Sequence, residues 1–170
     1  MGCKMFHLAS QYRTVYQEAV EAHLASITPG NNLMFAIGEI DCRPEEGIWP
    51  AAKKSGKDVQ ELVQETVDGY LAFIREALAQ YPFNSITIQG VPAPGYQLTE
   101  KRDPGDVPGF LQMIKAVNDR LKAGSLAQGW KFLDVYAATV NESGTGNGLW
   151  HLDGWHLKPT FYQQADRWLC

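Results

Sequence analysis

Short apolar segments alternate with amphipathic helical segments along most of this 170-residue chain. The apolar segments are residues 4–8, 33–37, 85–89 and 131–135, and turn-forming or polar residues follow them. Strands that alternate with helices of this length form parallel sheets joined by right-handed crossovers, with helices on both faces. The pattern therefore predicts a β-α-β-α-β-α-β order and a three-layer α/β/α sandwich.

Three long segments carry apolar residues at helical spacing, at about residues 12–27, 58–78 and 106–121. The second is the most regular, and Asp58 at its start is a residue type that caps helix N-termini. Pro159 predicts the start of a terminal helix, because proline is favoured in the first helical turn. The uninterrupted apolar run 33–37 indicates a central strand that is buried on both faces.

The composition excludes several classes of partner. The net charge is -4 and the Lys and Arg residues are scattered, so that no basic surface for nucleic acid is expected. No apolar stretch is long enough for a membrane span. We expect one domain over residues 1–170, because a chain of this length buries a sizeable core without staples.

Three widely spaced cysteines, Cys3, Cys42 and Cys170, form no Cys-x-x-Cys pair. This count argues against a disulfide framework and a zinc site, and it favours a reducing compartment. Residues 1–10 lack the long apolar region of a secretory signal, so that a cytoplasmic location is the expectation.

Two polar clusters, residues 38–43 and residues 153–156, lie far apart in the sequence, and the first directly follows a predicted strand. Parallel α/β sheets bind ligands outside the carboxyl ends of their strands. We therefore expect the two clusters to lie at the same edge of the sheet and to share one pocket.

Asp153 and His156 are three residues apart, so that a turn places both side chains on one side. The carboxylate can then accept the Nδ1–H of the imidazole, which leaves Nε2 free to act as a base. The same spacing also fits a loop salt bridge or a helix cap. Their position just before the terminal helix favours the catalytic interpretation.

Glu39, Asp41 and Arg43 would point to the same side of an extended segment. Two acids and one arginine could satisfy one another as a buried ion network. Alternatively, Asp41 or Arg43 binds or polarises polar groups of a substrate, while Gly38 lets the backbone approach it. The two interpretations are compatible.

Other chemistry-bearing residues near these clusters carry less weight. His151, Asp153 and His156 are metal-ligand types, but all three come from one short loop, so that no metal site is expected. The acidic neighbour of Cys42 would raise the pKa of its thiol, which argues against a thiolate nucleophile. Trp150 and Trp155 could line an apolar or sugar pocket, although core packing is the more common role of tryptophan.

These residues resemble the SGNH, or GDSL-like, hydrolase superfamily, which implies a flavodoxin-like parallel sheet and a Ser-His-Asp site. The segment Asp-Gly-Trp-His-Leu at 153–157 resembles the last block of the family, Asp-x-x-His. The resemblance implies that Asp153 orients the ring and that His156 is the general base. Gly-Glu-Ile-Asp-Cys-Arg at 38–43 occupies the place of the Gly-x-Asn-Asp block, with Ile40 in place of the oxyanion-binding Asn. It resembles a variant branch of the superfamily, in which Asp41 and Arg43 have open roles.

The family's nucleophile lies in a Gly-Asp-Ser block after its first strand, and no Gly-Asp-Ser occurs in this sequence. No serine of the chain is a convincing substitute for it. We therefore expect the chain to be N-terminally truncated, with the first strand and its serine missing. That strand would lie between the strands predicted at 4–8 and 33–37, and its absence would leave backbone groups unpaired.

The sequence thus predicts an SGNH-like ester hydrolase or acyl-transferring domain acting on a small acyl ester, with a carbohydrate ester as one candidate. A serine from outside the chain would attack, and Gly38 would donate a backbone hydrogen bond to the oxyanion. No cofactor is required, and the chain alone is expected to lack triad-type turnover. The alternative is a non-catalytic module that binds an acidic or sugar ligand through Arg43 and the two tryptophans. Self-association through the uncovered sheet edge is also expected.

Overall fold

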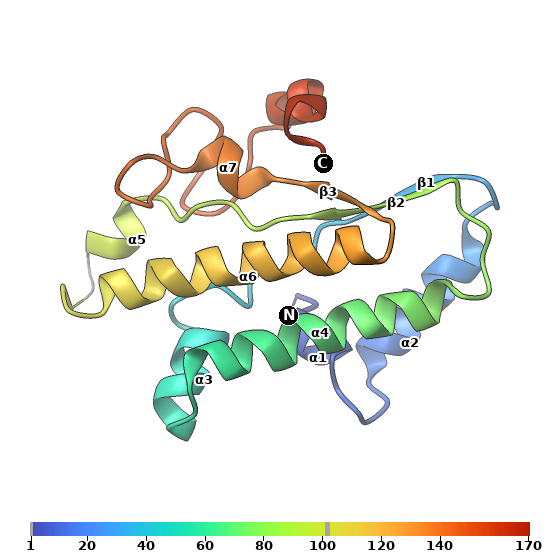
Figure 1. The fold of residues 1–170 in the computed structure, drawn as a ribbon, viewed down its shortest axis with the longest axis horizontal. Coiled ribbons are helices and arrows are strands. Elements are labelled where there is room, and N and C mark those ends of the chain that lie inside the picture. Colours follow the sequence, from blue (N-terminus) through green and yellow to red (C-terminus); the bar gives the residue numbers. More distant parts are fainter. Residues whose placement is uncertain (1, 101–102) are drawn as a thin grey trace.

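The computed structural model describes residues 2–100 and 103–170 and is built around a three-stranded parallel sheet (Figure 1). The strands are β1 (Asn32–Phe35), β2 (Ser85–Gln89) and β3 (Lys131–Leu133), in the order β1-β2-β3. Leu33 lies opposite Ile86, and Ile88 lies opposite Phe132. The predicted α/β class and parallel strand direction are thus confirmed, with three strands in place of four.

Helices cover this sheet on both sides. They are α1 (Met5–Leu8), α2 (Val15–Ser26), α3 (Ile48–Ser55), α4 (Val59–Leu78), α5 (Gln97–Glu100), α6 (Val107–Ala127), α7 (Val135–Thr139) and the 3-10 helix η1 (Pro159–Trp168). In Figure 1, α6 and α4 lie on one side of the sheet, and η1 lies on the other. The arrangement is consistent with an α/β sandwich.

The two longest helices follow from their sequence patterns. Asp58 caps α4, because its side chain accepts hydrogen bonds from the N–H groups of Gln60 and Glu61. Val63, Val67 and other apolar residues of the same stripe are buried in the main core, which α6 completes from its own apolar face. Within the described part of the chain, no helix combines the length and the apolar character that crossing a membrane requires.

The strand predicted at residues 4–8 is wrong, because this segment forms α1. Met5 and Leu8, three positions apart, are both buried, as expected for one face of a helix. The carboxylate of Asp41 accepts hydrogen bonds from the N–H groups of Met5 and Phe6, 2.8 and 3.1 Å away. This carboxylate satisfies the first turn of α1 from outside the segment, which is why the local pattern did not indicate a helix.

The strand predicted at 33–37 is present as β1, but it lies at an edge of the sheet and not at its centre. Its residues alternate between exposed and partly buried, and Met34 is 49% exposed. The strand predicted at 131–135 ends at Leu133, because the side chain of Asp134 accepts from the N–H of Ala137 and starts α7. The terminal helix is present from Pro159, with 3-10 geometry.

The loop after β2 is held by one buried side chain of α6. The Oδ1 of Asn118 accepts from the N–H of Val91 at 2.8 Å, and its Nδ2 donates to the carbonyl of Ile114 at 3.0 Å. Asn118 is 4% exposed, so that water does not replace these bonds when the side chain is removed.

We predict that Asn118→Ala lowers the free energy of unfolding by about 1–3 kcal/mol, because it leaves the buried N–H of Val91 without a partner. Urea denaturation of both proteins measures the difference. Asp119→Ala is the matched control, since its exposed ion pair with Lys115 contributes about 0.5 kcal/mol or less. Equal stabilities of the two variants would contradict the prediction.

Candidate functional site

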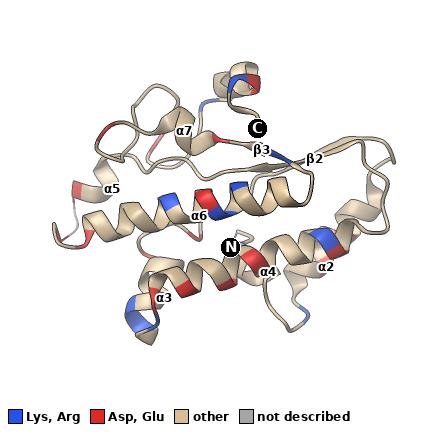
Figure 2. Cartoon of the chain, viewed as in Figure 1, with Lys and Arg blue, Asp and Glu red and all other residues tan. Residues whose placement is uncertain are grey.

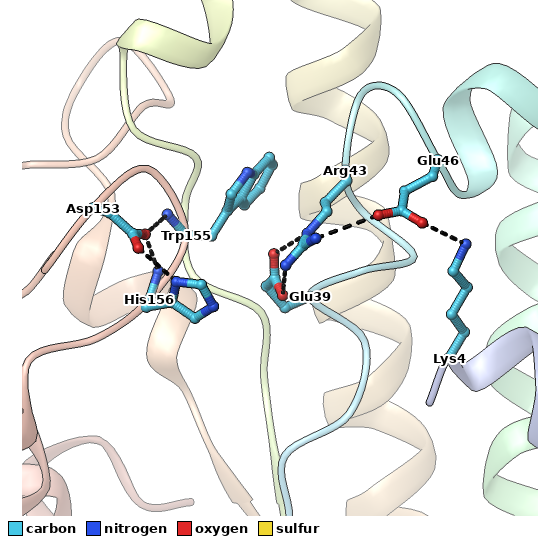
Figure 3. A network of polar contacts seen from close by, with 7 residues as sticks. All are labelled: Lys4, Glu39, Arg43, Glu46, Asp153, Trp155 and His156. Atoms are coloured by element: carbon cyan, nitrogen blue, oxygen red, sulfur yellow. Dashed lines mark hydrogen bonds and ion pairs between the residues drawn. The ribbon is translucent and has the colours of Figure 1, made fainter. Parts of the chain in front are cut away.

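Asp153 and His156 form a compact hydrogen-bonded pair (Figure 3). One carboxylate oxygen, Oδ1, accepts from the backbone N–H groups of Trp155 and His156, each at 2.8 Å. The other oxygen, Oδ2, lies 2.6 Å from Nδ1 of His156. The turn thus holds the carboxylate against the ring, and Nε2 of His156 has no hydrogen-bond partner within residues 2–100 and 103–170. The pair has the geometry of a base and the group that orients it.

The Asp153 carboxyl is kept ionised by its surroundings. Its partial burial is the largest single influence and raises the pKa, but hydrogen bonds from the backbone and ring of His156 and the backbone of Trp155 outweigh it. The net result is that the pKa of Asp153 is lowered to about 2. Asp153 is therefore an anion at neutral pH, as a group that stabilises a positively charged imidazole must be.

The loop after β1 is a turn and not the extended segment that the sequence analysis assumed. The N–H of Cys42 donates to the carbonyl of Gly38, and the N–H of Arg43 donates to that of Ile40, both at 3.2 Å. This coiling brings Glu39 and Arg43 together, with Nε–Oε1 and Nη2–Oε2 distances of 2.7 and 3.0 Å. Asp41 points elsewhere, so that the expectation of three charges on one face is wrong.

Arg43 also contacts an acid that sequence reasoning missed. Its Nη1 lies 3.3 Å from Oε1 of Glu46, and Oε2 of Glu46 lies 3.1 Å from Nζ of Lys4. The hydrogen bond to Glu39 is the main cause that raises the pKa of Arg43. Glu39, Arg43, Glu46 and Lys4 form a row of alternating charges, which Figure 3 shows beside the His–Asp pair. The row contains two acids and two bases and is neutral as a whole.

Asp41 is a buried cap for α1. It is 1% exposed, and its two oxygens accept from the N–H groups of Met5 and Phe6. Burial is the largest influence on this carboxyl, and it raises the pKa to about 6 against the opposing effect of these hydrogen bonds. In this structure both oxygens of the side chain hold the first turn of α1.

Gly38 lies where the backbone approaches two other segments. Its φ of +133° belongs to a region that favours glycine. A Cβ atom there would lie 3.2 Å from both the Cε of Met5 and the Cγ2 of Val91. Among the described residues the N–H of Gly38 has no hydrogen-bond partner. Gly38 is itself buried, so that its unpaired N–H lies away from bulk solvent at the carboxyl end of β1.

The loop after β2, residues 90–96, connects the two clusters, and sequence reasoning did not assign it to the site. Val91 is next to Gly38, as described above. Farther along this loop, the carbonyl of Ala93 lies 2.7 Å from Nε2 of His151, and the N–H of Gly95 donates to the carbonyl of Gly154 at 2.9 Å. The turn-rich sequence Val-Pro-Ala-Pro-Gly directly after this strand is the sequence feature that could have assigned the loop to the site. Both clusters therefore lie at the carboxyl edge of the sheet.

The remaining candidates near the pair have structural roles. His151 is held by the carbonyl of Ala93 and not by Asp153 or His156. Trp150 packs edge-on against Phe161 and Trp168 in a core cluster under η1. Trp155 packs against the main core and lies between the His–Asp pair and the Glu39–Arg43 pair in Figure 3. Only the second tryptophan is therefore placed to form a wall between the two clusters.

Comparison with known proteins gives a fold neighbour. No protein-family model and no curated protein matches the chain. A solved structure from Streptococcus pneumonia, described as "a putative platelet activating factor", aligns with a TM-score of 0.51 and 14% sequence identity. The alignment covers 89% of this chain and 89% of that chain. The two chains therefore share an overall α/β arrangement over most of their length.

We predict that the neutral ring of His156 carries its proton on Nδ1, because the Oδ2 of Asp153 accepts a hydrogen bond only from a protonated Nδ1. Asp153→Ala should shift the ring toward the Nε2–H form. Two-dimensional ¹H–¹⁵N spectra of the imidazole rings at pH 8 distinguish the two tautomers. His151 is the internal control, since the Ala93 carbonyl holds its proton on Nε2 in both proteins. An unchanged His156 signal in the variant would contradict the prediction.

We predict that the buried carboxyl of Asp41 makes stability depend on pH. Its folded-state pKa of about 6 lies above the ordinary value of 3.8, so that the folded protein binds this proton more tightly than the unfolded chain. The resulting stabilisation is complete below pH 3.8 and is lost as the pH rises through 6.

Urea denaturation at pH 5 and pH 7 compares the wild type with Asp41→Asn, which removes the titration. We expect the wild type to gain about 1 kcal/mol more than the variant between pH 7 and pH 5. Parallel pH profiles for the two proteins would show that Asp41 does not titrate in this range.

Proposed function

We propose that this chain is an SGNH-type ester hydrolase or acyl-transferring domain of flavodoxin-like fold, with Asp153 and His156 as two members of a catalytic triad. The observation that carries the proposal is the 2.6 Å contact between Oδ2 of Asp153 and Nδ1 of His156. It leaves Nε2 without a partner among the described residues, at the edge of the sheet where ligands of such folds bind. The nucleophile is a serine that residues outside this chain supply.

In this mechanism the serine hydroxyl attacks the acyl carbon of a small ester, and His156 Nε2 takes its proton. Asp153 stabilises the imidazolium that forms. The N–H of Gly38 is the proposed donor to the oxyanion, because it is buried and has no partner in the described part of the chain. The ester C–O bond then breaks as Nε2 returns the proton to the leaving oxygen. Water or an acceptor alcohol releases the acyl group in a second cycle of the same steps.

The charge balance of the site favours a neutral ester over an acidic ligand. A module that binds acids through Arg43 would need this guanidinium free, yet Glu39 and Glu46 both contact it. An acidic ligand at Arg43 would have to displace the bidentate contact with Glu39 as well as the contact with Glu46. Arg43 is already paired, whereas Nε2 of His156 has no partner among the described residues. The catalytic function therefore has more support than the binding module.

We predict that the chain alone gives no serine labelling with a fluorophosphonate probe. A longer protein translated from the same reading frame, if it includes an upstream Gly-Asp-Ser segment, should be labelled and should hydrolyse aryl acetates. In that longer protein, His156→Ala should lower kcat/KM by about 10⁶-fold, because the general base is lost. Probe fluorescence on gels and initial rates of nitrophenol release are the measurements.

The matched control is His23→Ala, which removes an exposed histidine of α2 and should leave the rate unchanged. Hydrolysis that survives His156→Ala would refute the assignment of the base. An upstream region without any serine-bearing segment, together with ligand binding in the absence of turnover, would favour the non-catalytic module.

A further inference from the structure

Residues 90–95, in the loop after β2, are all buried and include no charged side chain. In Figure 2 the ribbon that leads from β2 towards α5 accordingly carries neither of the colours of charge. The backbone groups of a buried loop need hydrogen-bond partners, because water does not reach them. The N–H groups of Val91 and Ala93 donate to the side chains of Asn118 and Thr139, at 2.8 and 2.9 Å. The loop is therefore fixed to α6 and α7 on one side.

The His–Asp pair lies in a separate loop that is closed at its base. His151 and Leu157 form an antiparallel bridge. Just inside this bridge, the N–H of Leu152 donates to the carbonyl of His156 at 2.7 Å. We call residues 151–157 the His–Asp loop. Because these bonds lie inside the loop, they hold its shape but do not fix its place on the protein.

Two hydrogen bonds among the described residues join the His–Asp loop to the loop after β2. The N–H of Gly95 donates to the carbonyl of Gly154 at 2.9 Å. At the base, Nε2 of His151 lies 2.7 Å from the carbonyl oxygen of Ala93, and it is the donor because a carbonyl only accepts. Trp155 adds packing against the main core, but apolar packing is non-directional. The two hydrogen bonds therefore define where the His–Asp loop sits.

The surroundings of the His151 ring are shaped for this one bond. Within residues 2–100 and 103–170 the bond to Ala93 is the only hydrogen bond of the ring, since its buried Nδ1 has no partner. A Cβ atom on Gly146 would lie 2.7 Å from Cε1 of the ring, so that glycine leaves the room that the imidazole occupies. The N–H of Gly146 donates to the carbonyl of Pro94 at 2.8 Å. The ring is thus enclosed beside the loop that it binds.

The loop after β2 also touches the proposed oxyanion donor. A Cβ atom on Gly38 would lie 3.2 Å from the Cγ2 of Val91, two positions before Ala93. One buried segment therefore contacts Gly38 and also holds the His–Asp loop through His151. Groups that act together in a transition state are effective only when they are fixed relative to one another before the reaction.

We propose that His151 is a positioning residue of the candidate site. Its Nε2–H bond to the Ala93 carbonyl fixes the His–Asp loop on the loop after β2, and so sets the place of the His156 ring relative to the N–H of Gly38. His151 itself contacts no reacting atom and transfers no proton. The inference rests on the proposed function, since it assigns a role within that site, but it is tested on the order of the loop and not on turnover.

The test separates the hydrogen bond of His151 from the volume of its ring. His151→Phe keeps a ring and removes the donor, whereas His151→Gln places an amide donor at about the position of Nε2. We expect His151→Phe to speed hydrogen exchange of the Gly95 amide by about tenfold or more, because the remaining bond to Gly154 opens more readily. The ¹⁵N order parameters of residues 153–156 should fall from about 0.85 to below about 0.6. His151→Gln should leave both readouts close to the wild-type values.

A second variant leaves His151 in place. Gly146→Ala puts a Cβ atom where the ring lies, so that it displaces the donor without removing it and should resemble His151→Phe in both readouts. Its matched control is Gly105→Ala, because a Cβ atom on Gly105 has no neighbour closer than 3.4 Å. The amide of Val117, in the middle of α6, is the reference for global unfolding.

Unchanged exchange and order in His151→Phe would overturn the proposal. A Gly95 amide that speeds up only as much as the amide of Val117 would do the same, since the effect would then be a general loss of stability. Retention in His151→Phe together with loss in His151→Gln would show that the ring only fills space. None of these readouts depends on esterase activity, so that failure here is separate from failure of the proposed function.

Discussion

The carboxylate of Asp41 links the loop after β1 to the first helix, and the geometry of the candidate site depends on this link. Its oxygens accept hydrogen bonds from the N–H groups of Met5 and Phe6, so that the loop after β1 fixes the position of the first turn of α1. Lys4 is the residue before the first turn of this helix, and its Nζ lies 3.1 Å from Oε2 of Glu46. One buried charge thus positions both ends of the charge row from Lys4 to Glu39. Such a charge is costly to bury, and the two hydrogen bonds offset only part of the cost, as the raised pKa indicates.

The same arrangement explains why the site is nearly neutral although it contains many ionisable groups. Acids and bases alternate from Glu39 through Arg43 and Glu46 to Lys4, and Asp153 faces the imidazole ring of His156. Charges of opposite sign arranged in this way hold one another in place and largely cancel beyond the row. A transition state that separates charge between an imidazole and an oxyanion benefits from such fixed dipoles more than from a net charge of either sign.

The elements that the sequence predicted well are those whose stabilising partners lie within the element. Helix α4 contains its own apolar stripe and its own cap, Asp58, and the strand at 85–89 is bounded by its own turns. Residues 4–8 were misassigned because their cap, Asp41, comes from 36 positions away. The turn at 38–43 was missed because two alternating acids and an arginine also fit a strand. The Asp153–His156 contact was predictable, since a three-residue spacing and a turn are sufficient to form it.

The orientation of the candidate oxyanion donor, the N–H of Gly38, depends on how the preceding strand β1 is held in the sheet. Gly38 follows β1, and the direction of its N–H depends on how firmly this strand is held. β1 contains four residues and is paired with β2 on one side only, so that its carboxyl end is constrained mainly by packing against Met5 and Val91. Donors stabilise a developing charge well only when they are fixed before the reaction. The packing of Gly38 against Met5 and Val91 is therefore what orients this N–H in the described part of the chain.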